Sequence, residues 1–224
     1  MEHIEKRQFI LPLLTLSAFF LLVPSARAYV PELVAPQSVG ENISIADPTL
    51  KQYFYGTLDD FPHTYELVVK EPTELSVEVH VPDTVGAQDV VNGIIVKREG
   101  RQGRVVEVAR LLAKDAQWES WYEPWGADSY RKGSTYHATV EPGTYRVEVS
   151  TPDNTAPYVL VIGTRDDREG VSYFEMVKRI IAVKQFYGRA PIAAILSPYL
   201  YIPILVILFV SIVAYVRRVR KAHS

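Results

Sequence analysis

The 224-residue chain contains no cysteine. Disulfides, thiolate metal sites and a cysteine nucleophile are therefore all excluded. Any domain that the chain forms must be stabilised by side-chain packing alone. This is common among prokaryotic envelope proteins and less usual among small secreted animal domains.

Motifs for catalysis and metal binding are also missing. The sequence has no Gly-x-Ser-x-Gly and no His-Glu-x-x-His, so the usual serine-hydrolase and zinc-protease signatures are absent. His63, His80 and His137 lie far apart and show no paired ligand spacing. We therefore predict no enzymatic activity, no metal and no cofactor. An enzyme would instead need paired carboxylates in a cleft, for which Glu119 and Glu123 are the candidates.

Positive charge is scarce in most of the chain. Residues 29–170 hold 13 Lys and Arg against 23 Asp and Glu, whereas residues 171–224 hold 8 against 1. An acidic domain argues against nucleic-acid binding, because phosphates require a positive surface. The basic residues surround a C-terminal apolar run, where they can meet anionic lipid head groups.

Residues 1–28 have the pattern of a secretory signal peptide. A basic pair precedes the apolar run 9–24, and Ala26 and Ala28 occupy the small-residue positions of a cleavage site. The apolar run is short for a membrane span. We predict cleavage after Ala28. An uncleaved anchor is the alternative, because two glutamates dilute the basic start.

Residues 190–216 contain no charged side chain over 27 positions, which is enough for a helix to cross a bilayer. Prolines in the first half predict that the regular helix begins near Tyr199 or is kinked there. With an exported N-terminus, the basic tail 217–224 is expected in the cytoplasm, and the domain outside the cell membrane. The predicted membrane-interface residues are Tyr199, Tyr201, Arg217, Arg218, Arg220 and Lys221.

Residues 169–189 predict an amphipathic juxtamembrane helix. Ser172 and Glu175 fit a capping box, in which each side chain satisfies an open backbone amide. Apolar residues and Lys184 share one side of this helix. That side could lie on the membrane surface, or the helix could pack against the domain or extend the span.

Apolar and polar residues alternate through much of residues 50–168, as in strands with one buried face. Leu75, Val77 and Val79 are an example. Residues 158–162 are continuously apolar, which is typical of a strand buried on both faces. Pro142-Gly143 predicts a hairpin between two alternating runs. The predicted strands cover residues 65–69, 75–81, 92–97, 105–112, 136–140, 145–149 and 158–162.

These runs, separated by turn residues, predict an all-β fold: an antiparallel jelly-roll-like β-sandwich ectodomain over residues 50–168, followed by the juxtamembrane helix and one transmembrane helix. Residues 105–112 also fit a short helix. Residues 29–49 show no clear period and predict an extended lead-in.

The segment 136–150 reads Tyr-His-Ala-Thr-Val-Glu-Pro-Gly-Thr-Tyr-Arg-Val-Glu-Val-Ser, and 156–163 reads Ala-Pro-Tyr-Val-Leu-Val-Ile-Gly. Together they resemble the end of bacterial pre-peptidase C-terminal (PPC-like) domains. Gly56-Thr-Leu and Tyr65-Glu-Leu-Val-Val resemble the opening of the same family. The resemblance covers residues 52–163 and implies a jelly-roll-like accessory module. The shared motif is structural, so no functional residue is carried over.

All three tryptophans lie within residues 118–125. Exposed aromatic faces beside carboxylates could stack on sugars or receive a partner's side chain. Alternatively, the indoles pack across one end of the sandwich, as large aromatic residues usually do. The candidate ligand-binding residues are Trp118, Trp121, Tyr122, Trp125 and Tyr130.

The sequence therefore predicts a non-enzymatic, single-pass type I membrane protein. Its sandwich would bind or support a component of the cell envelope, so the expected partners are the lipid bilayer and an envelope protein or glycan. The alternative function is a carbohydrate-binding module that uses the tryptophan segment.

Overall fold

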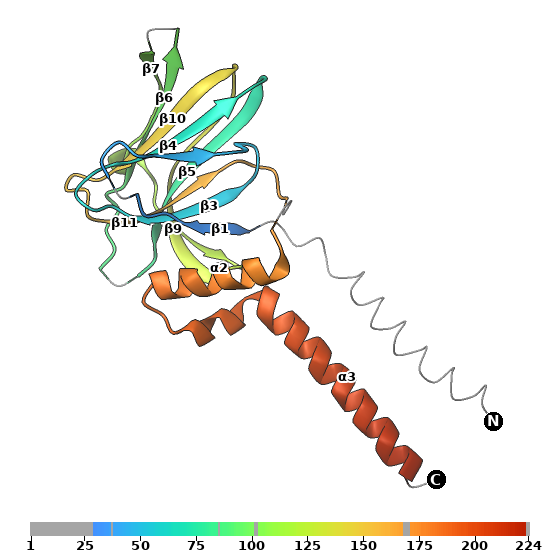
Figure 1. Ribbon diagram of the computed structural model, residues 1–224. Helices are drawn as coiled ribbons and strands as arrows, with labels where there is room; N and C mark the ends of the chain where they lie inside the picture. Colours follow the sequence, from blue (N-terminus) through green and yellow to red (C-terminus); the bar gives the residue numbers. More distant parts are fainter. Residues whose placement is uncertain (1–28, 37, 85, 101–102, 168–170, 223–224) are drawn as a thin grey trace.

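The computed structural model describes residues 29–36, 38–84, 86–100, 103–167 and 171–222 (Figure 1). The predicted signal peptide, residues 1–28, lies outside the described residues. Two β-sheets, a short helical layer and one long projecting helix make up the described chain.

The two sheets form the predicted β-sandwich. In spatial order, the six-stranded sheet A contains β1 (Val30–Leu33), β3 (Gln52–Thr57), β11 (Pro157–Ile162), β5 (Thr73–Pro82), β9 (Asp128–Val140) and β8 (Glu119–Glu123). The five-stranded sheet B contains β2 (Asn42–Ile45), β4 (His63–Val69), β10 (Gly143–Ser150), β6 (Asn92–Glu99) and β7 (Arg104–Leu111). A 3₁₀ turn, η1 (Ala113–Asp115), follows β7. β7 is a strand, so the helical alternative for this segment is wrong.

Residues 29–49 are part of the sandwich and not only a lead-in. β1 pairs in parallel with β3, and β2 pairs in parallel with β4, so each adds an edge strand to a different sheet. The other strand pairs are antiparallel. Each of the two strands is four residues long, which is too short to show a two-residue period in the sequence.

The turn at Pro142 does not form the predicted hairpin. β9 belongs to sheet A and β10 to sheet B, so the turn carries the chain from one sheet to the other. The hydroxyl of Tyr145 donates to the carbonyl of Glu141 at 2.7 Å and holds this turn closed. Turn residues specify that a chain reverses, but they do not specify which sheet accepts the returning strand.

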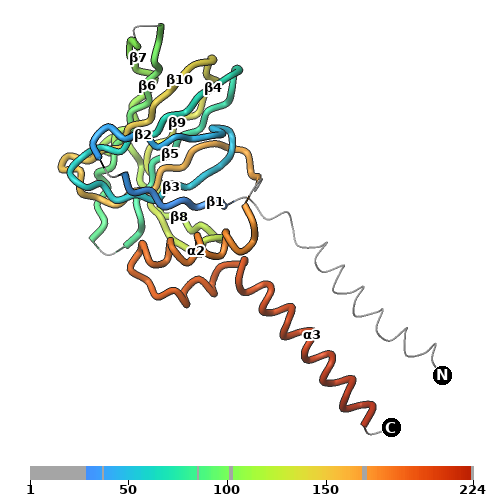
Figure 2. The backbone as a smooth tube through the Cα atoms, in the orientation of Figure 1, coloured from blue at the N-terminus to red at the C-terminus, as the bar shows by residue number. Residues whose placement is uncertain are grey.

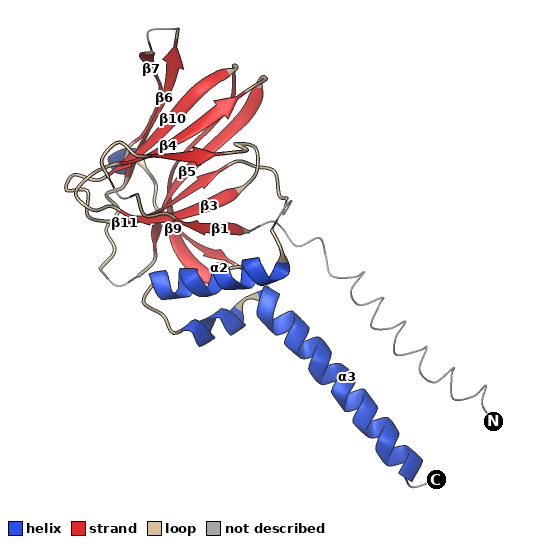
Figure 3. Ribbon diagram, viewed as in Figure 1, coloured by secondary structure: helices blue, strands red, loops and turns tan. Residues whose placement is uncertain are grey.

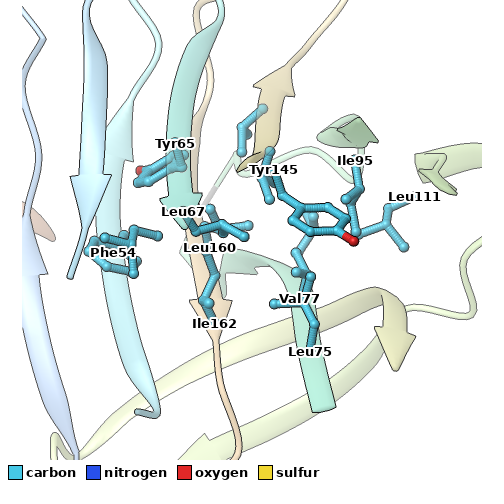
Figure 4. Close-up of a cluster of buried hydrophobic side chains, with 14 of the residues drawn as sticks. Phe54, Tyr65, Leu67, Leu75, Val77, Ile95, Leu111, Tyr145, Leu160 and Ile162 are labelled. Atoms are coloured by element: carbon cyan, nitrogen blue, oxygen red, sulfur yellow. The ribbon is translucent and has the colours of Figure 1, made fainter. Parts of the chain in front are cut away.

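The main core lies between the two sheets (Figure 4). Alternate side chains of both sheets meet there, as expected for sheets packed face to face. Its fully buried members include Phe54, Tyr65, Leu67, Leu75, Val77, Ile95, Leu160 and Ile162.

A second core covers the outer face of sheet A. Helix α2 (Tyr173–Phe186) lies across this face, and the 3₁₀ helix η2 (Pro191–Leu196) runs back beneath α2 (Figures 1 and 3). The hydroxyl of Ser172 accepts from the amide of Glu175 at 3.2 Å, so the predicted capping serine begins α2. The side chains buried in this second core include Tyr53, Tyr55, Val159, Val161, Met176, Ile180 and Val183.

Packing on both faces of sheet A explains the continuous apolar pattern of β11. Leu160 and Ile162 point into the main core, whereas Val159 and Val161 point into the second core. The prediction that this strand is buried on both faces is therefore confirmed. The same packing shows that α2 is docked on the domain, the second of the positions considered for it. Its apolar side is covered by protein.

Helix α3 (Pro198–Ala222) projects away from the sandwich (Figure 2). It has 25 residues, a mean hydropathy of 2.5 over its most apolar part, and little burial, so it could cross a membrane by length and composition. It begins one residue before Tyr199, as predicted. Residues 190–197 of the predicted span instead form η2 and its flanks, and the basic residues 217–221 form the last turns of α3.

Candidate functional site

The tryptophan segment lies where the sandwich meets the helical layer. β8 is the edge strand of sheet A, and a tight turn over residues 124–127 returns the chain into β9. Ala127 takes a positive φ of 55° in this turn. Trp118 precedes β8, Trp121 lies within it, and Trp125 lies in the turn. The three indoles therefore occupy three different surroundings.

Trp118 packs inward on the main core. Its indole NH donates to the carbonyl of Ala113 at 3.1 Å. A Cβ on Gly133 would come within 2.6 Å of its ring, so the glycine leaves the room that this indole fills. The ring of Trp118 is thus held by the protein on one side.

Trp121 packs on the outer face of sheet A. Its ring stacks on Tyr130 with centroids 6.0 Å apart and an interplanar angle of 27°. The Lys132 ammonium lies 4.2 Å from the centre of the Trp121 ring, a cation–π arrangement. Tyr130 is fully buried, so it offers no face to a ligand.

Trp125 joins the turn to the start of α3. Its ring lies 5.4 Å from that of Tyr199, and its carbonyl accepts a hydrogen bond from the hydroxyl of Ser197. Tyr199 is buried in this contact, although it was predicted at the membrane interface, whereas Tyr201 is 40% exposed. Tyr122, with 54% of its surface exposed, is the open aromatic side chain of the segment.

A buried charge cluster lies beneath this turn. Lys184 of α2 is buried, and its Nζ donates to Asp128 Oδ1 at 2.7 Å and to the carbonyl of Ala127 at 2.9 Å. It also donates to the carbonyl of Gly126. Arg189 donates to the same Asp128 oxygen at 3.1 Å. These bonds tie α2 to the β8–β9 turn.

Burial shifts the pKa of both partners of this pair towards their neutral forms. It raises the pKa of Asp128 and lowers that of Lys184, while the hydrogen bond between them opposes both changes. The charged pair persists because Lys184 has two further carbonyl acceptors and Asp128 has a second cation. Such a pair adds little net stability, but removing one partner leaves the other charge buried.

Glu123 is the second buried acid of the turn. Burial raises its pKa to about 7, against the hydrogen bonds that it accepts from the amides of Gly126 and Trp125, and the charge of Asp128 raises it further. Glu119, four residues earlier on β8, is exposed. The two carboxyls named as a candidate catalytic pair therefore lie in different surroundings.

Tyrosine hydroxyls form a chain behind the cluster. Tyr29 and Tyr55 share a hydrogen bond of 2.6 Å, and Tyr55 and Tyr130 share one of 2.5 Å. Burial raises the pKa of all three phenols well above their ordinary value. They are neutral at physiological pH, and they join the residue that precedes β1 to β3 and β9. Their role in the described structure is packing.

In the described parts of the chain, no three side chains of His, Asp or Glu come together as a metal site. His80 instead bonds Glu78 at 2.9 Å. Arg217, Arg218, Arg220 and Lys221 lie together on the last turns of α3, where they are exposed. Their placement at a membrane interface stays a prediction, as does ligand binding by the tryptophan segment.

The charge cluster was not predicted, although one signal for it was present. Lys184 shares the apolar side of α2, where a cation is costly unless it is paired. Nothing in the sequence identifies Asp128 as its partner, because the two residues are 56 positions apart. Tyr29 and Tyr55 carried no signal beyond being aromatic.

Comparisons with protein-family models and with curated protein sequences find no match. Among solved structures, the chain is similar to the pre-peptidase C-terminal domain of a collagenase from Bacillus anthracis, with 15% identity over 57% of this chain and 98% of that one and a TM-score of 0.36. It is also similar to PliG, a periplasmic inhibitor of g-type lysozyme from Aeromonas hydrophila, with 13% identity over 62% of this chain and 100% of that one and a TM-score of 0.34.

A third similar structure is the mitogen derived from Yersinia pseudotuberculosis, with 15% identity over 54% of this chain and 90% of that one and a TM-score of 0.34. Likenesses at this level support no inference about activity or partners. The first of them agrees with the resemblance drawn from the sequence motifs: the described sandwich is similar to a pre-peptidase C-terminal domain.

Proposed function

We propose that the chain is a non-enzymatic, single-pass membrane protein that holds its β-sandwich outside the cell membrane, where the sandwich binds or supports another component of the envelope. One observation carries this proposal. The membrane-length helix α3 is joined to sheet A through η2 and α2, whose inner sides are buried against the sheet.

The surface of α3 supports the membrane part of the proposal. Its exposed side chains are almost all large and apolar over three to four turns, which is costly in water. A bilayer removes this cost, because lipid chains cover such a surface. The most exposed of these residues include Leu205, Ile207, Leu208, Phe209 and Ile212.

The distribution of charge supports the orientation. Of the four basic residues in segment 171–197, three belong to ion pairs of the folded domain: Arg179 lies 3.3 Å from Glu175, while Lys184 and Arg189 both bond Asp128. Positive charge that belongs to a folded domain has little influence on the orientation. The basic residues at the end of α3 are exposed, and such a cluster marks the cytoplasmic side.

The short connection between sandwich and α3 supports a role that depends on position. Ser197 alone separates η2 from α3, and its hydroxyl is bonded to the carbonyl of Trp125. A flexible linker would let the domain sample many orientations. Here the sandwich is held in one orientation relative to α3, with the outer face of sheet B turned away from the helices (Figure 3).

The orientation is tested with reporters fused after Ser224 of the full chain. A reporter that works only in the cytoplasm should be active, and one that works only outside should be inactive. The opposite result overturns the orientation. Recovery of all the protein in the soluble fraction overturns the membrane placement.

The binding role is tested by photo-crosslinking in native membranes. Val68 and Val105 are exposed apolar residues on β4 and β7 of sheet B. A crosslinker at these positions should capture the same partner, whereas one at the matched control Val39, outside the strands, should not. Equal capture from all three positions indicates non-specific contact and contradicts the proposal.

Glycan binding remains the alternative function, because Tyr122 presents an exposed aromatic ring on an edge strand beside Trp121 and Trp125. The tryptophan fluorescence of the full protein should then respond to some polysaccharide. If Tyr122→Ala, Trp121→Ala and Trp125→Ala each leave all such binding unchanged, the alternative is excluded.

A further inference from the structure

Large apolar side chains are exposed on the helical layer at the foot of the sandwich, outside α3. Phe174 of α2 is 77% exposed, and Ile192 and Leu196 of η2 are 74% and 63% exposed. Tyr173 and Ile195 beside them are also exposed. We call these five residues the apolar collar. Contiguous exposed groups of this kind mark an interaction surface.

The collar lies beside the point where α3 begins. The hydroxyl of Tyr173 donates to the carbonyl of Tyr199 at 2.6 Å, which fixes the first turn of α2 beside the first turn of α3. η2 lies on the side of α2 that faces away from the sandwich, level with the start of α3 (Figure 2). η2 contacts both α2 and α3, so the collar lies on elements that adjoin the start of α3, where Tyr201 and Ile204 are also exposed.

The other sides of these elements are already occupied. Ala194 of η2 and Met176 and Ile180 of α2 are buried in the second core. The second core is therefore already filled from the inner sides of α2 and η2, and the collar residues on their outer sides are not part of it. Exposed apolar residues on elements that adjoin a membrane-spanning helix can be covered by the same bilayer.

The backbone of η2 can enter a poorly hydrated layer. The amide of Ala193 donates to the carbonyl of Ala190, and that of Ser197 donates to that of Ala194, both at 2.9 Å. Polar backbone groups must be satisfied internally wherever water is scarce. η2 also contains no charged residue, so its entry costs little.

A cation lies at the right place for lipid head groups. Lys178 is exposed and follows Phe174 by four residues, so the two share one side of α2. A lysine in this position can extend its ammonium to phosphates while its methylene groups stay beside apolar side chains. Aromatic and basic residues together are typical of an interfacial surface.

We propose that the apolar collar inserts into the interfacial layer of the outer leaflet, so that the sandwich rests on the membrane through η2 and the first turn of α2. This inference rests on the proposed function, which places α3 across the bilayer. It adds that the domain is seated on the lipid surface and does not stand clear of it. Interfacial segments of this kind sink about 5–10 Å into the boundary between head groups and acyl chains.

The absence of cysteine allows a direct test. Single cysteines at Phe174, Ile192 and Leu196 are labelled with an environment-sensitive fluorophore, and the full chain is placed in anionic liposomes. Leu208 in α3 and Val105 on sheet B are the matched controls. Lipids carrying a nitroxide either near the head group or near the bilayer centre then report the depth of each label.

We expect the three collar labels to lose emission mainly to the shallow nitroxide, the Leu208 label mainly to the deep one, and the Val105 label to neither. Unquenched collar labels with a quenched Leu208 label overturn the collar and leave the anchor intact. An unquenched Leu208 label overturns the proposed function itself. Collar labels that are shielded from water but insensitive to both nitroxides indicate a protein occupant, and this also overturns the proposal. Unchanged tryptophan emission confirms that each variant is folded.

Discussion

Glu123 should make the stability of the sandwich depend on pH. Its carboxyl is buried and has a pKa of about 7 in the folded protein, against an ordinary value of 4.5. The folded state therefore keeps a proton that the unfolded chain loses between these two values. Because the folded pKa is raised, the stability that this group contributes is complete below about pH 4.5 and is lost as the pH rises towards 7.

The size of this effect follows from the same two values. A difference of one pKa unit corresponds to about 1.4 kcal/mol, so the free energy of unfolding contributed by Glu123 should fall by about 3 kcal/mol across the window. Glu123→Gln removes the titration, while the amide oxygen can still accept from the amide of Gly126. The variant should match the wild type at about pH 4 and exceed its stability by up to about 3 kcal/mol at about pH 8.

The difference between the two proteins is the measured quantity, because other groups titrate in the same range. Burial lowers the pKa of His63 and His80, so both add stability as the pH rises. Denaturant unfolding of the full chain in detergent is followed by tryptophan fluorescence, since all three tryptophans lie within seven positions of Glu123. Glu119→Gln is the control, because Glu119 lies on the same strand and is exposed. If the free energy of unfolding changes with pH by the same amount in the wild type and in Glu123→Gln, the raised pKa of Glu123 is refuted.

Three further substitutions test the junction. Lys184→Met should destabilise the protein by about 3–5 kcal/mol, because it leaves Asp128 buried without its main partner; chemical denaturation measures the loss, and a wild-type value contradicts it. Gly133→Ala places a methyl within 2.6 Å of the Trp118 ring, so we expect a loss of about 1–3 kcal/mol and a shift in tryptophan emission, whereas an unshifted spectrum would show that the ring is not held there. Tyr122→Ala should change stability by less than about 0.5 kcal/mol, because the ring is exposed, and a larger loss in thermal unfolding would show that it packs.

The strands that line the main core could be predicted from the sequence. In β4, β5 and β10, one face meets the core and the other meets solvent or polar groups, so a two-residue period appears. The continuous apolar run of β11 indicated burial on both faces, and the two cores confirm it. The pattern along a single strand was sufficient to predict these strands, because it records which of its own side chains face a core.

Other features depend on contacts that no local pattern records. The apolar side of α2 predicted that this side is buried, but not whether lipid or sheet A covers it, because both are apolar. The turn at Pro142 predicted a reversal, but the choice of sheet depends on pairing with β4 and β6, far along the chain. Edge strands β1 and β2 form because they pair with β3 and β4. Their own β-strand propensity does not predict them.

The tryptophan segment shows the same limit at the candidate site. Clustering of aromatic residues within residues 118–125 marked a candidate site, yet it could not separate binding from packing. The structure gives each indole a protein neighbour: Gly133 for Trp118, Tyr130 for Trp121 and Tyr199 for Trp125. Gly133 and Tyr130 belong to β9 and Tyr199 belongs to α3, so these neighbours depend on strand pairing and on where α3 begins.

The second core links the sandwich to α3. The outer face of sheet A carries Tyr53, Tyr55, Val159 and Val161, and in the described parts of the chain α2, η2 and the start of α3 pack on it. A chain cut before α2 would leave this apolar face open to water, which favours association. The helices that join the domain to α3 thus also complete its second core. Changes at the Lys184–Asp128 contact should consequently alter both the stability of the sandwich and its orientation relative to α3.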